Sequence, residues 1–132
     1  MTKSLLHLRD GDNYESVNWR DSRSIPGVRF ATRRVSLGQR IELNRRLREL
    51  MLRHEFLRAG ESEDKLEASL SELLVRKLYL EWGLAEISGL KIDGGAASTQ
   101  DLVERGPESL TNEITEAVQN ELTLSEEERK NS

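Results

Sequence analysis

Two long helices are the clearest elements that the hydrophobic pattern predicts. Residues 37–59 and 62–84 place leucines three and four positions apart, which is the spacing of one face of an α-helix. Ser36 and Gln39 fit a capping box at the start of the first helix, and Gly60 fits its stop. The short link after Gly60 favours an antiparallel helical hairpin.

Each of these helices carries a main and a second apolar stripe. The main stripes are Leu43, Leu47, Leu50, Met51, His54 and Leu57 in the first helix, and Leu66, Leu70, Leu73, Leu74, Leu80 and Leu84 in the second. The second stripes are Ile41, Leu52 and Phe56, and then Ala68, Val75, Tyr79 and Trp82. A chain of 132 residues cannot easily bury four stripes, so we expect a partner helix or a second copy to cover one of them. The alternative is that the N-terminal strands and the C-terminal helix of the same chain cover them.

The N-terminal segment shows the shorter period of β-strands. Val28, Phe30 and Thr32 alternate with polar or small neighbours, which predicts a strand with one apolar and one basic face. Residues 1–35 are therefore interpreted as a basic segment of two or three short strands, or as an extended arm. Because so few strands cannot form a core alone, any sheet must pack against the helices.

Shorter elements follow the two long helices. Asp93-Gly94-Gly95 predicts a turn, and Ser98 predicts the cap of a short helix that ends at Arg105. Pro107 and Glu108 mark the start of a last helix. Its apolar stripe is Leu110, Ile114, Ala117, Val118 and Leu122. Residues 125–132 are polar enough to be a tail.

Together these patterns predict a mainly α fold with a small β segment, and an α+β fold is the alternative. The expected organisation is a basic extended or β segment at 1–35, a helical domain at 36–124 and a polar tail at 125–132. The length and the 36% of hydrophobic residues suit one small domain.

The net charge of −4 hides a division between the two halves of the chain. Residues 1–60 hold 13 Lys and Arg against 7 Asp and Glu, whereas residues 61–132 hold 7 against 17. The halves therefore carry +6 and −10. One interpretation is that the halves attract each other, within one chain or between copies. The other is a basic patch for nucleic acid or an acidic partner, formed by Arg29, Arg33, Arg34, Arg45 and Arg48.

The sequence offers little for catalysis. It has no cysteine and only two histidines, so thiolate chemistry is excluded and a histidine-built metal site is not expected. No P-loop, Gly-x-Gly-x-x-Gly or Gly-x-Ser-x-Gly motif is present. We expect no enzyme activity, no cofactor and no metal. No apolar run approaches the roughly 20 residues of a membrane span, and the N-terminus does not have the pattern of a signal peptide.

Several segments resemble the tail assembly chaperones of tailed phages. The resemblance rests on Leu78-Tyr79-Leu80-Glu81-Trp82-Gly83-Leu84, on Ile87-Ser88-Gly89-Leu90-Lys91-Ile92-Asp93-Gly94, on Ser98 to Arg105, on Gly106-Pro107-Glu108-Ser109-Leu110 and on the ending Leu124 to Asn131. In that family a helix ends near a tryptophan and a small excursion precedes further helices. The stretch from Val28 to Gln39 is also similar, and the resemblance covers the last two-thirds of the chain.

The resemblance implies a non-enzymatic protein of the host cytoplasm that binds and solubilises the tape measure protein during tail morphogenesis. It transfers no binding residues. From the stripes alone, the predicted partner-binding residues are Ile41, Leu52, Phe56, Val75, Tyr79 and Trp82. Two alternatives stay open: a structural component of the virion tail, neck or baseplate that uses an arginine-rich N-terminal arm, and, less favoured, a nucleic-acid-binding regulator.

Overall fold

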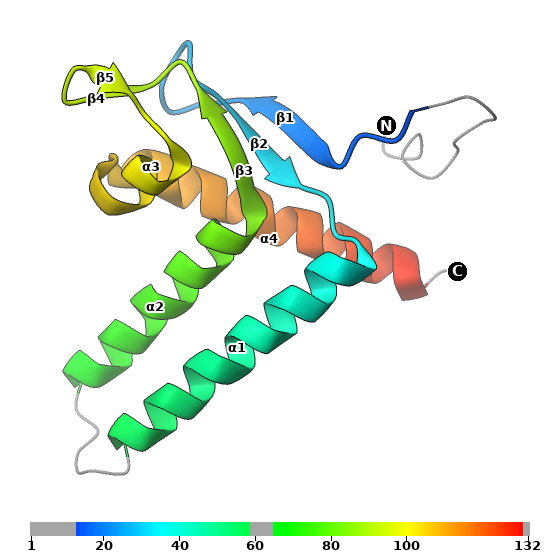
Figure 1. Ribbon diagram of the computed structural model, residues 1–132, viewed down its shortest axis with the longest axis vertical. Coiled ribbons are helices and arrows are strands. Elements are labelled where there is room, and N and C mark those ends of the chain that lie inside the picture. Colours follow the sequence, from blue (N-terminus) through cyan, green and yellow to red (C-terminus); the bar gives the residue numbers. More distant parts are fainter. Residues whose placement is uncertain (1–12, 59–64, 131–132) are drawn as a thin grey trace.

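The computed structural model describes residues 13–58 and 65–130 and folds them into a small antiparallel sheet covered by helices (Figure 1). Within this part of the chain there are a three-stranded sheet, a separate hairpin of two short strands and four helices. The strands are β1 (Val17–Asp21), β2 (Arg29–Arg33), β3 (Leu84–Ser88), β4 (Lys91–Ile92) and β5 (Gly95–Ala96). The helices are α1 (Leu37–Arg58), α2 (Lys65–Gly83), α3 (Thr99–Arg105) and α4 (Glu108–Lys130). The chain is thus mainly helical with a small sheet, which is an α+β arrangement.

Strand β2 lies at the centre of the sheet, between β1 and β3, and both neighbours are antiparallel to it. The predicted apolar face is confirmed, because Val28, Phe30 and Thr32 are all at most 2% exposed, but Ala31 on the opposite face is fully buried as well, so the alternation holds only in part. Helix α4 packs along the same sheet, and its predicted stripe is confirmed by the full burial of Leu110 and Ile114. The body of the protein is therefore the sheet together with α4.

Strand β3 begins where α2 ends, a transition that the sequence pattern did not predict. The pattern extends the helix to Leu84, but the helix stops at Gly83 and Leu84 opens the strand. The Arg33 guanidinium stabilises this junction by donating hydrogen bonds to the carbonyls of Trp82 (3.2 Å) and Leu84 (2.8 Å). Gly83 lies close to α4, since a Cβ there would sit 2.6 Å from the methyl groups of Val118.

The helix caps and the turn lie where the sequence analysis predicts them. The Ser98 side chain and Asp101 form a complete capping box, and α3 ends at Arg105 as predicted. Ser36 accepts a hydrogen bond from the Gln39 amide (3.1 Å), although the Gln39 side-chain oxygen has no partner among the described residues. Asp93 and Gly94 both have positive φ, which is the geometry of a tight hairpin turn between β4 and β5.

Helices α1 and α2 lie side by side and extend away from the sheet (Figure 1). We call this pair the arm. Near the sheet its side chains enter the core, as Leu43 and Leu80 do. Farther out, Met51, Leu70 and Leu73 are 64%, 46% and 52% exposed, although they belong to the main apolar stripes. Leu50, the residue before Met51, is only 8% exposed, so the arm is covered on one side there and these three side chains lie outside the covered side.

Helix α4 continues through residues 125–130, which the sequence predicted as a polar tail. The Arg40 side chain on α1 donates to the Ser125 hydroxyl (2.6 Å) and to the Glu126 carboxylate (3.1 Å). These contacts hold the end of α4 against the start of α1. They explain why so polar a segment stays helical.

Candidate protein-binding surfaces

A groove between α2 and α4 brings together two of the predicted partner-binding residues. Val75 and Tyr79 provide its apolar lining, and the groove has a volume of about 490 Å³. The Tyr79 ring packs edge-on against the Trp82 ring, with 6.3 Å between ring centroids. This contact helps to hold the orientation of the Tyr79 ring. The full lining is Glu72, Val75, Arg76, Tyr79, Asn112, Thr115, Glu116 and Gln119.

The polar lining of this groove is unevenly charged. Arg76 donates a hydrogen bond to the Asn112 side chain (3.0 Å), which links the two helices across the groove. Glu72 and Glu116 are exposed, and neither makes a hydrogen bond or ion pair with any other residue in the described part of the chain. The groove therefore presents apolar surface beside two free carboxylates. That combination suits a helical segment with apolar and basic side chains.

The arm exposes further apolar side chains outside the groove. Ile41 and Leu52, both predicted to bind a partner, are 59% and 56% exposed, and Leu37 is 77% exposed. Phe56 belongs to α1, but its side chain lies outside the described residues. With Met51, Leu70 and Leu73, these residues give the arm apolar surface on several sides. These side chains are candidates for contact with another protein.

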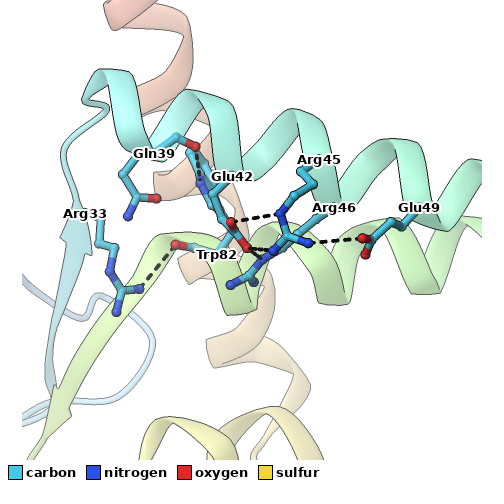
Figure 2. A network of polar contacts seen from close by, with 7 residues as sticks. All are labelled: Arg33, Gln39, Glu42, Arg45, Arg46, Glu49 and Trp82. Atoms are coloured by element: carbon cyan, nitrogen blue, oxygen red, sulfur yellow. Dashed lines mark hydrogen bonds and ion pairs between the residues drawn. The ribbon is translucent and has the colours of Figure 1, made fainter.

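Trp82 is not on the surface, contrary to its predicted role as an anchor for a partner. Only 3% of it is exposed, and its indole N–H donates a hydrogen bond to the Gln39 carbonyl (2.8 Å; Figure 2). This bond ties the end of α2 to the first turn of α1. Trp82 is thus part of the core that holds the arm on the body. The aromatic stripe of the sequence did not reveal on which side of the helix the body would lie.

The five arginines of the predicted basic patch are divided between the sheet and α1. Arg29 pairs with Asp21 (3.0 Å) and lies over the Trp19 ring. Arg33 binds the carbonyls at the α2–β3 junction, and Arg34 donates to the Glu15 carbonyl and lies over the Tyr14 ring. Arg45 pairs with Glu42 and Glu49, which leaves Arg48 as the one of the five without a partner among the described residues.

Glu42 is the centre of a charged network on α1 (Figure 2). It accepts hydrogen bonds of 2.7 Å from Arg46 and from Arg45. The bond from Arg46, followed by that from Arg45, holds the pKa of the Glu42 carboxyl below its ordinary value. Glu42 in turn raises the pKa of Arg45. This network of ion pairs stabilises one side of α1.

Contacts between the basic and acidic halves run within the single chain. Arg20 pairs with Glu121, which is only 8% exposed, and Arg40 pairs with Glu126. Glu113 accepts hydrogen bonds from the Ser22 hydroxyl (2.7 Å) and the Arg23 amide (2.6 Å) in the turn between β1 and β2. Part of the predicted attraction between the halves is therefore satisfied inside the molecule. No sequence signal marked Glu113 for this role.

The environment of Glu113 changes its acidity. Burial by itself raises the pKa of the Glu113 carboxyl, but the hydrogen bonds from the Arg23 amide, the Ser22 hydroxyl and Ser24 outweigh burial. The pKa therefore lies below its ordinary value. The carboxylate acts as a structural anchor for the β1–β2 turn.

Metal-binding geometry is missing from the described residues, since no group of three or more His, Cys, Asp or Glu side chains converges there. His7 and the side chain of His54 lie outside that part of the structure. Within residues 13–58 and 65–130, none of the helices has the length and apolar character to span a bilayer. Comparison of the chain with protein-family models, with curated proteins and with solved structures found no match.

Proposed function

We propose that this chain is an assembly factor of the phage tail assembly chaperone type, which binds the tape measure protein through apolar faces of the arm. In this proposal α1 and α2 act as an antiparallel helical hairpin and cover helical segments of the partner before the tail tube forms. The observation that carries the proposal is the exposure of Met51, Leu52, Leu70 and Leu73 on the outer half of the arm.

The arrangement of the arm supports a helical partner. Helix α1 has 22 residues, which gives it a length of about 33 Å, and Leu50 is the last of its described residues that is buried. An amphipathic helix laid along the outer half would bury apolar residues of both chains, which is the usual mode of helix recognition. The paired charges on α1, such as Glu42 with Arg45, keep the uncovered arm hydrated.

Co-expression with the tape measure protein of the same genome tests the proposal. We expect the wild-type chain to keep that protein in the soluble fraction and to co-purify with it. The double variant Leu52→Asp with Leu73→Asp should lose both effects, because it places two charges in the proposed interface. Since both side chains are more than half exposed, the fold itself should change in stability by about 0.5 kcal/mol or less.

A matched control carries the same two charges elsewhere. Tyr14 and Leu124 are exposed hydrophobic residues outside the arm, so Tyr14→Asp with Leu124→Asp should leave the solubilising effect intact. Equal solubility of the tape measure protein with and without the wild-type chain would refute the proposal. Equal loss in both double variants would show that the arm is not the binding surface.

The structural-virion alternative makes a different prediction for the mature particle. Its sequence cue was an arginine-rich N-terminal arm, yet Arg29 and Arg33 belong to the central strand β2 and bind neighbouring groups. This placement favours the assembly-factor proposal. Mass spectrometry of purified particles should find the chain absent, whereas a stoichiometric amount in the particle would support the virion component instead.

A further inference from the structure

Two further surfaces of this protein are opposite in charge and match in the spacing of their residues. The first is a row of exposed side chains along α1 that begins at the body end of the helix. We call it the α1 outer stripe and define it as Leu37, Ile41 and Arg48. At 100° per residue these side chains lie within about 40° of one another around the helix, and all three are exposed. The second surface is the groove between α2 and α4, which Val75 and Tyr79 line.

The charges of the two surfaces are opposite. Helix α1 has six Arg against three Glu, and Arg48 on its outer stripe has no partner among the described residues. Between Glu108 and Glu128, α4 carries seven Glu and neither Lys nor Arg. At the groove itself Glu72 and Glu116 are unpaired in the described part of the chain. The division into halves of +6 and −10 is thus only partly neutralised inside one molecule.

The spacing of these groups also matches. Ile41 and Arg48 are seven residues apart on α1, and Glu72 and Tyr79 are seven residues apart on α2. Each interval corresponds to about 10.5 Å along a helix axis. When an α1 helix lies antiparallel to α2, Ile41 therefore meets Tyr79 at the same register at which Arg48 meets Glu72.

We propose that the protein forms a two-fold dimer in which the α1 outer stripe of each copy lies in the α2–α4 groove of the other. The contact is made twice, because a two-fold axis repeats every contact between the copies. Ile41 covers the apolar lining of the groove, and Arg48 meets the Glu72 carboxylate and offsets one of the two free negative charges of the groove. Leu52 and Leu73, on the outer half of the arm, take no part in this contact. The dimer can therefore be tested independently of the proposed chaperone function.

Sedimentation velocity with charge-reversed variants tests this dimer. The wild-type chain should sediment as a dimer at micromolar concentrations and dissociate as salt is added. Arg48→Glu alone, and Glu72→Arg with Glu116→Arg, should each raise the dissociation constant about tenfold or more, because repulsion replaces attraction at both copies of the contact. An equimolar mixture of the two variants should dimerise again, since the reversed stripe then meets the reversed groove.

Two control variants place single charge reversals away from the contact. Arg53 lies about 140° around α1 from Arg48, and Glu86 lies on β3, so Arg53→Glu and Glu86→Arg should sediment as the wild type. Three results would overturn the proposal: a monomeric wild type, self-association that both reversals leave unchanged, or a mixture that stays monomeric. Restored dimerisation in the mixture is the result that a general effect of net charge cannot produce.

Discussion

The body and the outer half of the arm both carry regularly spaced apolar residues but differ in what covers them. In the body, Phe30, Leu110 and Ile114 are at most 1% exposed because the sheet and α4 enclose them. On the outer arm, Leu52 and Leu73 are more than half exposed. The comparison teaches that the repeating leucines of the arm are not core by default. Their exposure is the feature on which the proposed function depends.

The sharpest way to test this difference is to truncate one side chain in each region. Phe30→Ala should destabilise the protein by about 3–5 kcal/mol, because it opens a cavity in the enclosed core. Leu52→Ala should change the free energy of unfolding by about 0.5 kcal/mol or less. Urea denaturation of both variants measures the two values, and similar values would mean that the arm is as well covered as the body.

The next prediction concerns the contact between Gly83, at the end of α2, and Val118 on α4, where the arm meets the body. Gly83→Ala should cost about 1–3 kcal/mol, because the added methyl group collides with Val118 on α4. Combining it with Val118→Ala should relieve the collision, so the double variant should lose less stability than the two single losses added together.

Gly38→Ala is the matched control for this contact. It lies in the first turn of α1, where an added Cβ meets nothing closer than the Ser36 hydroxyl at 3.9 Å. Alanine favours the helix more than glycine does, so this variant should be neutral or stabilised by up to about 1 kcal/mol. Equal destabilisation by the two alanines would argue against a close contact between α2 and α4.

A smaller effect concerns the turn that Glu113 anchors. Because the folded state lowers the pKa of Glu113, its contribution to stability is present above the pKa of the unfolded state. The contribution is lost as pH falls through the lower pKa of the folded state. Glu113→Gln should be less stable than the wild type near neutral pH, and the difference should shrink on acidification. A difference that is constant from neutral to acidic pH would contradict the anchoring role of the carboxylate.

Local features of the fold could be predicted from the sequence because nearby residues determine them. The caps at Ser36 and Ser98 and the Asp93-Gly94 turn depend on groups only a few residues apart. The start of β3 at Leu84 could not be predicted in this way. It depends on Arg33, which lies about fifty positions earlier and binds the carbonyls at that junction.

The candidate surfaces could be predicted only in part for a related reason. Periodicity identifies which residues share a face, and it correctly grouped Val75 with Tyr79 in what became one groove. It does not indicate which part of a stripe is covered, so Trp82, a predicted partner-binding residue, lies in the core, whereas Met51 of a main stripe is 64% exposed. The position of α4, set by long-range packing on the sheet, decided both.

Hydrogen–deuterium exchange on the co-purified complex with the tape measure protein tests most directly whether the outer arm is the binding surface. Amides around Leu52 on α1 and around Leu73 on α2 should gain protection in the complex, because the partner covers the outer arm. Amides of β2 and of the buried stripe of α4 should exchange as in the free chain. Protection confined to the sheet, with the outer arm unchanged, would contradict the claim that the arm binds the partner.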